Sequence, residues 1–271
     1  MKKIIQMHPI TSSMALVFLC TISIRITEPI WAEQSHVQWI LGIEAHHFFS
    51  GTTRLLLTVP TAIVLGIVIR KNGFRFSFSP KGSKKAWFAS VFTCLFILFQ
   101  FIHFINLSVR DLQIIPFIPT ILFFDAANSI FEEVLFRGLF MTAMLLRFGD
   151  TVKGRVFCVF LSAVLFGGVH YSQGFMGAFS SFFIGFAWGA VYLYSKNLLV
   201  LMIVHYLWNI VGKITGAFYM GMWHSELWMQ ITAGTQSIFL FFVFIPFALY
   251  LCVKAEPFSG YFLSDWSNNL K

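Results

Sequence analysis

Charged residues are scarce in this sequence. Asp, Glu, Lys and Arg make up 11% of its 271 residues, against about a quarter in an ordinary soluble domain. The polar stretches between the apolar runs are short and leave no room for a separate soluble domain. We therefore expect residues 1–271 to form a single membrane-embedded domain.

Paired cysteines and metal-binding spacings are missing as well. The four cysteines lie far apart, each inside an apolar run, which excludes a disulfide framework and indicates buried thiols. The sequence has no HExxH motif and so carries no helical zinc signature. It also shows no inverted internal repeat of the kind found in many transporters, and no low-complexity tract.

Apolar residues dominate the composition. Hydrophobic residues make up 58% of the chain, Phe alone occurs 35 times, and mean hydropathy is +0.78. Crossing the hydrocarbon core takes about 20 mostly apolar residues. Eight runs approach this length and predict an all-α, polytopic transmembrane helix bundle: residues 10–31, 47–69, 86–107, 114–146, 156–171, 175–194, 198–220 and 231–253.

Basic residues indicate the orientation of these runs, because Lys and Arg concentrate in cytoplasmic segments. An N-terminus inside the cell places 14 of the 19 basic residues in segments 1–9, 70–85, 147–155, 195–197 and 254–271. We therefore expect both termini to be cytoplasmic. The net charge of +8 is then a topology signal, and no nucleic-acid partner is predicted.

The first run also resembles a signal peptide, because Lys2 and Lys3 precede a short apolar stretch. Residues 25–29 (RITEP) make a poor cleavage region, which favours an uncleaved first span over a signal peptide.

The fourth run is both long and charged. As one straight helix, residues 114–146 would extend about 50 Å, so a bend or a tilted helix is expected. The run contains Asp125, Glu132, Glu133 and Arg137. A charge in hydrocarbon costs at least ~2.5 kcal/mol, so ionisable residues within a span indicate function.

Helical spacing separates these charges into two groups. Glu133 and Arg137 are i and i+4 neighbours and can neutralise each other. Asp125, Asn128 and Glu132 form a polar stripe along one helix face, which must face the protein interior or a wet cavity. Glu132 is thereby presented as a proton acceptor, whereas Asp125 suits either a supporting role near the site or a buried hydrogen bond.

Two later spans contribute histidines. FGGVH ends at His170, and HYLWN places His205 and Asn209 one helical turn apart. A glutamate, two histidines and an asparagine from three helices can supply a base, groups that orient a water, and oxyanion donors. Each histidine taken alone also fits a hydrogen-bonded core residue, and Glu133 with Arg137 also fits a structural ion pair.

Three motifs together resemble one family. EEVLFRG, FGGVH and HYLWN look like the EExxxR, FxxxH and HxxxN motifs of the CAAX protease and bacteriocin-processing family, the Abi or Rce1-like membrane endopeptidases. The resemblance implies a glutamic-type endopeptidase with its catalytic core at about residues 114–220. Glu132 would be the base and His170 would hold the water, Glu133 and Arg137 would stabilise the site, and His205 with Asn209 would form the oxyanion hole.

The same resemblance defines the expected cofactors and partners. No cofactor is expected; were zinc present, Glu132, His170 and His205 would be its ligands. The partners are the lipid bilayer and a membrane-associated peptide or protein. The protein would lie in the cell membrane of a bacterium or the endoplasmic reticulum membrane of a eukaryote.

Several functions remain open at this level. Bacterial-type peptide or protein processing is the first, and removal of the C-terminal tripeptide from prenylated CAAX proteins is the second. A bacteriocin-immunity or scaffold protein and a proton-coupled transporter are non-proteolytic alternatives.

Overall fold

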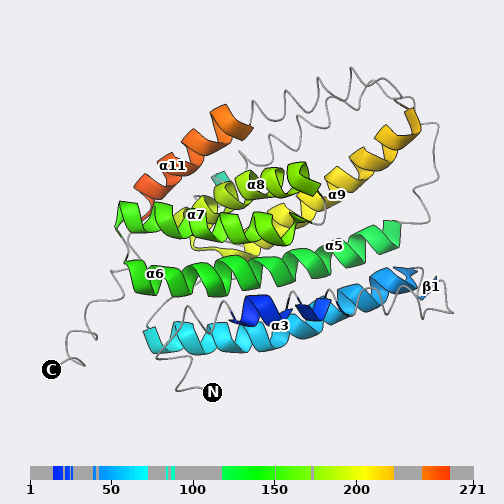
Figure 1. The fold of residues 1–271 in the computed structure, drawn as a ribbon, viewed down its shortest axis with the longest axis horizontal. Coiled ribbons are helices and arrows are strands. Elements are labelled where there is room, and N and C mark those ends of the chain that lie inside the picture. The colour runs from blue at the N-terminus through cyan, green and yellow to red at the C-terminus, as the bar shows by residue number, and fades with distance from the viewer. Residues whose placement is uncertain are drawn as a thin grey trace.

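The protein is nearly all helical in its computed structural model (Figure 1). The structure describes residues 15–20, 22–24, 26, 39–40, 43–72, 84, 87–88, 118–149, 151–171, 174–222 and 240–256. Within these residues the strands are limited to an antiparallel pair, β1 (Trp39–Ile40) and β2 (Ile43–Glu44).

A long helical segment lies at the centre of the structure. It consists of α5 (Ile118–Glu132), the π-helix η2 (Glu133–Met141) and α6 (Thr142–Phe148). All nine residues of η2 are buried. The predicted run 114–146 is therefore helical throughout its described part, but its hydrogen bonding changes to the rare π pattern at Glu133.

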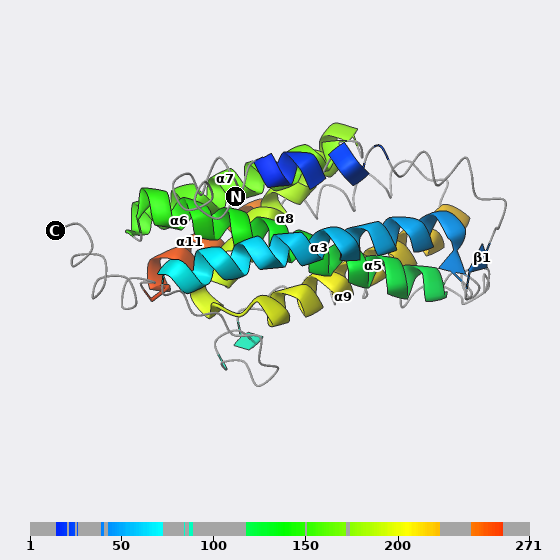
Figure 2. The ribbon, with the colours of Figure 1, turned by 90° about the horizontal axis from the view of Figure 1, so that it is seen from below.

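Helix α3 (Ala45–Asn72) lies alongside this segment (Figures 1 and 2). Arg54 contacts Asn128, and Leu65 packs over Gly138, so α3 and α5 to η2 run in the same direction. A Cβ atom at Gly138 would lie only 2.8 Å from Leu65 Cδ2. Glycine at this position therefore permits the close approach of α3.

Helices α7 (Val152–Val169) and α8 (Gly174–Ser195) form an antiparallel hairpin. Gly167 faces the backbone of α8, where an added Cβ would lie 2.8 Å from the Ala178 carbonyl oxygen, whereas Gly168 has open space. One glycine of the FGGVH motif thus serves helix packing.

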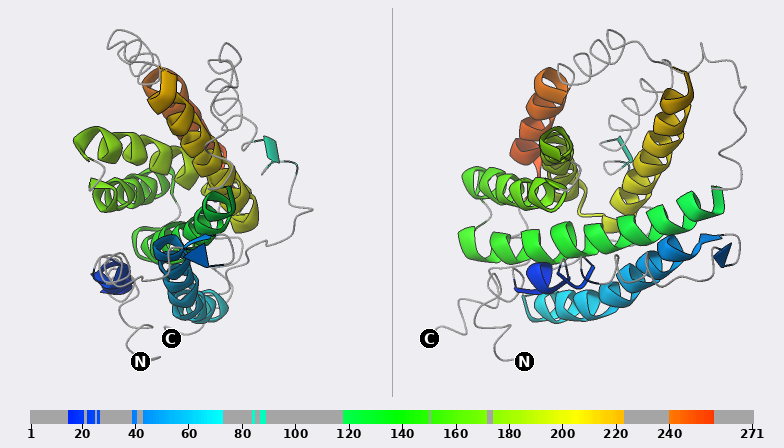
Figure 3. Two further views of the ribbon diagram at one scale, coloured as in Figure 1. Left: turned by 90° about the vertical axis from the view of Figure 1, so that its right-hand side faces the viewer. Right: turned by 45° about the vertical axis from the view of Figure 1, so that its right-hand side comes forward.

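Helix α9 (Leu198–Met222) begins next to η2 and rises away from it (Figure 3). Leu198 lies against Gly138, and Asn209 contacts Ser129, so α9 runs antiparallel to α5. The short π-helix η4 (Leu240–Phe244) and α11 (Ile245–Lys254) follow. Arg155 of α7 donates to the main-chain carbonyls of Cys252 and Ala255. These hydrogen bonds hold the C-terminal end of α11 against α7.

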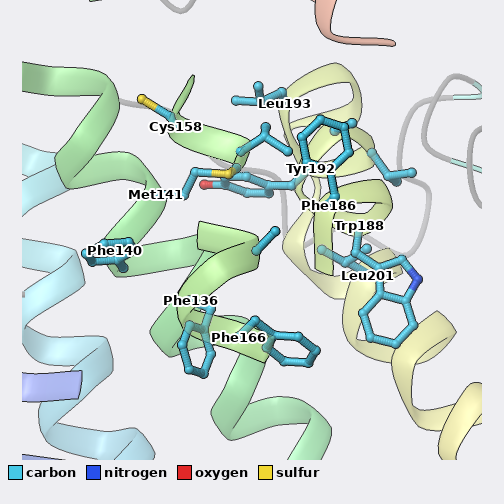
Figure 4. Close-up of a cluster of buried hydrophobic side chains, with 14 of the residues drawn as sticks. Phe136, Phe140, Met141, Cys158, Phe166, Phe186, Trp188, Tyr192, Leu193 and Leu201 are labelled. Carbon is cyan, nitrogen blue, oxygen red and sulfur yellow. The ribbon is translucent and has the colours of Figure 1, made fainter. Parts of the chain in front are cut away.

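The apolar core surrounds η2. Phe136 and Met141 face the buried side chains of α7, α8 and α9, including Phe166, Trp188, Tyr192 and Leu201, whereas Phe140 lies on the opposite side of η2 (Figure 4). This core fixes the position of η2, which carries Glu133 and Arg137.

Among the residues that the structure describes, three helical stretches are long and apolar enough to cross a membrane: Ala45–Ile67, Val152–Val169 and Gly177–Ser195. They coincide with three predicted runs, 47–69, 156–171 and 175–194. Run 198–220 lies within α9, and the end of run 231–253 is helical in η4 and α11. Most of runs 10–31 and 86–107, and the start of 231–253, lie outside the described residues.

Gly167→Ala is expected to destabilise the protein, because its new methyl group would meet the main chain of α8, which cannot move without separating the helices. The free energy of unfolding should fall by about 1–3 kcal/mol, measured as a lower Tm in detergent. Gly168→Ala is the matched control and should leave Tm unchanged or slightly higher. Equal Tm values for the two variants would contradict the packing described for α7 and α8.

Candidate active site

The structure brings five of the six predicted site residues into one connected group. Glu132 ends α5, Glu133 and Arg137 lie on η2, His170 follows the last turn of α7, and His205 lies on α9. Ion-pair or hydrogen-bond distances link these five side chains. Asn209, the sixth, lies one turn beyond His205 and contacts α5.

Glu133 is the buried centre of this group. Its Oε1 atom accepts from Arg137 Nη1 at 3.0 Å and lies 2.8 Å from His205 Nδ1. The side chains of Glu133 and Arg137 are 0% exposed. A buried carboxylate is tolerated only when it is paired and hydrogen-bonded, and Glu133 has one partner on its own helix and one on α9.

Arg137 is further enclosed by aromatic rings. Its guanidinium carbon lies 4.3 Å from the ring centroid of Phe166 and 5.6 Å from that of Trp188, within cation–π range. The Trp188 ring also lies 4.3 Å from the His205 ring. Trp188 therefore supports both partners of Glu133.

Glu132 lies between the two histidines. Its Oε1 atom is 3.9 Å from His170 Nε2, and its Oε2 atom is 3.6 Å from His205 Nε2. Within the described part of the chain, Oε2 has no hydrogen-bond partner. The side chain remains 11% exposed, in contrast to the fully buried side chain of Glu133.

The contacts of the two Nδ1 atoms determine which nitrogen of each histidine ring carries the hydrogen. They therefore determine what each Nε2 atom presents to Glu132. His170 Nδ1 lies 2.7 Å from the Phe166 carbonyl oxygen, which can only accept, so Nδ1 carries the hydrogen. His205 Nδ1 bonds to Glu133 in the same way when that carboxylate is ionised. Each neutral ring therefore presents an unprotonated Nε2 toward Glu132.

This arrangement gathers proton acceptors around one point. A carboxylate and two imidazole lone pairs repel one another unless a proton, a water or a cation lies between them. Distances of 3.6 and 3.9 Å are too long for direct hydrogen bonds. A water molecule that bonds to two of these groups would therefore lie beside the line that joins them.

The donor atoms are slightly farther apart than the ligand atoms of a zinc ion. Ligand atoms of a tetrahedral zinc ion with bonds near 2.1 Å lie about 3.4 Å apart, closer than the two distances at Glu132. Among the residues that the structure describes, no three His, Cys, Asp or Glu side chains are arranged to hold a metal ion.

Asn209 contacts a residue that the motifs did not indicate. Its Nδ2 atom donates to Ser129 Oγ at 3.4 Å, and Ser129 is buried one turn before Glu133 on α5. The carboxamide of Asn209 therefore lies beside α5. It is on the side of the helix that carries Glu132 and the rest of the polar stripe.

The remaining polar residues of α5 contact neighbouring helices. Asp125 is 1% exposed, so its side chain lies inside the protein. Asn128 accepts a hydrogen bond from Arg54 of α3. The predicted stripe thus faces the protein interior, between α3 and α9.

Sequence reasoning missed Arg54, Ser129 and Trp188. Arg54 carried a usable signal, because it is a charge inside an apolar run and falls under the same rule that singled out Glu132. Ser129 and Trp188 carried none, since serine is common in such helices and the chain has eight tryptophans.

Comparison with known proteins agrees with the motifs. Residues 114–211 match the model of a family described as type II CAAX prenyl endopeptidase Rce1-like. No curated protein and no solved structure matched the chain. The matched segment contains all six site residues and confirms the resemblance predicted from EEVLFRG, FGGVH and HYLWN. The central part of this chain, residues 114–211, is therefore similar to the Rce1-like family.

Proposed function

We propose that this protein is a membrane-embedded endopeptidase that hydrolyses a peptide bond with a water activated by Glu132. One observation carries the proposal: the Glu132 carboxylate lies between the Nε2 atoms of two histidines, 3.9 and 3.6 Å away, without a direct hydrogen bond to either. The family match supports protease activity, and the apolar helices support a location in the membrane.

In the proposed mechanism, Glu132 and His170 hold the attacking water. His170 accepts from the water at Nε2, because the Phe166 carbonyl keeps the hydrogen on Nδ1. Glu132 removes one proton as the water oxygen bonds to the scissile carbonyl carbon. Protonated Glu132 then returns that proton to the leaving amine as the C–N bond breaks.

The developing oxyanion is stabilised from α9. Asn209 donates from Nδ2, and His205 donates from Nε2 after it has bound a proton there from solvent, which makes its ring an imidazolium. Glu133 accepts from His205 Nδ1 and so stabilises the imidazolium, as an orienting carboxylate does in a catalytic triad. Arg137 balances the charge of Glu133 and takes no part in the bond changes.

The substrate is a membrane-associated peptide or protein. Bacterial-type peptide or protein processing is the first candidate, and removal of the C-terminal tripeptide from a prenylated CAAX protein is the second. The family description names the CAAX prenyl activity, and the presence of prenylated CAAX proteins in the host would favour it.

Eight spans around one catalytic core fit this function. Helices α3 and α5 run in the same direction, so two spans formed by them require a return crossing between, which the predicted run 86–107 supplies. We propose a single domain with both termini in the cytoplasm, in the cell membrane of a bacterium or the endoplasmic reticulum membrane of a eukaryote.

Glu132→Gln keeps the shape of the side chain but removes the base. Peptide release should fall to background while the protein remains folded. The measurement is a quantitative comparison of membrane and secreted peptides from wild-type and Glu132→Gln cells, with Tm in detergent as the control for folding. Unchanged release by a folded Glu132→Gln protein would refute the proposed function, including its alternatives among proteases.

We also propose that the reaction needs no metal. Prolonged treatment of the purified protein with a strong chelator should leave peptide cleavage unchanged, because Glu132 and His170 together activate the water. Loss of cleavage that added zinc restores would contradict the metal-free mechanism. Glu132, His170 and His205 would then be the ligands to test.

A further inference from the structure

Arg54 is a charged residue in the middle of a candidate membrane span, on a helix outside the segment that matches the family. Its Nε atom donates to Asn128 Oδ1 at 2.8 Å, and its Nη1 atom donates to the side chain and main chain of Ser50. Its guanidinium carbon lies 4.8 Å from the Phe124 ring centroid. These contacts hold the arginine against the polar stripe of α5.

The contact with Arg54 determines how the Asn128 carboxamide is oriented. Arginine carries only donors, so the carboxamide must turn its oxygen toward Arg54, which places the Nδ2 group and its two N–H donors on the other side of the amide plane. The positive charge on Arg54 also polarises the amide and strengthens these donors.

Asn128 lies close to the candidate active site. Asn128 and Glu132 are i and i+4 on α5, one helical turn or about 5.4 Å apart along the axis. Both are on the face that meets α3 and α9, since Arg54 contacts Asn128 and His205 lies by Glu132. Asn128 is half-buried, in contrast to the fully buried Glu133.

We propose that Asn128 is a substrate-binding residue, which donates from Nδ2 to a main-chain carbonyl oxygen of the substrate, and that Arg54 is the residue that positions it. This inference rests on the proposed peptidase function and extends it to α3. An extended peptide rises about 3.3 Å per residue, so Asn128 would hold a carbonyl about two residues from the bond that Glu132 attacks. Because this contact is made to the main chain, it would align a substrate peptide irrespective of the peptide's side chains.

Two substitutions test the two roles. Asn128→Asp keeps an acceptor for Arg54 but removes both N–H donors. Arg54→Gln removes the charge that orients the carboxamide. The probe is the set of peptides that Glu132→Gln cells stop releasing, and its release rate should fall about tenfold in each variant, the size of one lost hydrogen bond. Tm in detergent should stay close to the wild-type value for Asn128→Asp.

Further variants separate positioning from general stability. Arg54→Lys keeps a cationic donor and should restore most of the release lost in Arg54→Gln. Adding Arg54→Gln to Asn128→Asp should cause little further loss, because the two residues act through one donor. Ser50→Ala removes the hydroxyl contact of Arg54 but leaves Asn128 and Arg54 in place, so it serves as the matched control, with release near the wild-type rate.

The outcomes distinguish this inference from the proposed function. Wild-type release by Asn128→Asp would overturn the inference, as would a loss of release that only follows a fall in Tm or in the amount of protein. Full additivity of Arg54→Gln and Asn128→Asp would also overturn it. Equal release by wild-type and Glu132→Gln cells would instead refute the proposed function, and the inference with it.

Discussion

The site depends on one buried carboxylate. Glu133 Oε1 contacts both Arg137 Nη1 and His205 Nδ1, and all three side chains are buried. A charge in such a place is stable only while its partners are present. This requirement fixes the position of α9 against η2 and the plane of the His205 ring, and the rings of Phe166 and Trp188 close around Arg137. The geometry of the candidate site follows from this arrangement.

Adjacent glutamates have opposite surroundings. Glu132 is separated from Glu133 by one peptide bond, yet its carboxylate is partly exposed and lies beyond hydrogen-bond distance of either histidine. The change from α-helix to π-helix occurs between them, and π-helical turns are frequent at functional sites. One carboxylate therefore maintains the structure while the other remains available to react, which is the division that the proposed hydrolysis requires.

Much of this site could be predicted because charges are costly in a membrane. That rule, with helical spacing, selected Glu132, Glu133, Arg137, His170, His205 and Asn209, and the structure places Arg137 on Glu133 as the spacing indicated. The contact between His205 and Glu133 could not be predicted, because it joins residues 72 apart in the sequence and depends on how α9 packs. The π-helix has no local signal either, since packing of η2 among its neighbours produces it. The same rule could have identified Arg54. Its contact with Asn128 could not be predicted, because the two residues lie 74 apart in the sequence.

The stability of two neighbouring variants tests the division between the glutamates most directly. Tm of Glu133→Gln and of Glu132→Gln should be measured side by side in the same detergent. Glu133→Gln leaves Arg137 buried without its carboxylate, which should lower the free energy of unfolding by about 3–5 kcal/mol and reduce Tm clearly, whereas Glu132→Gln should unfold close to the wild-type temperature. Equal Tm values for the two variants, or a larger loss for Glu132→Gln, would contradict the structural role assigned to Glu133.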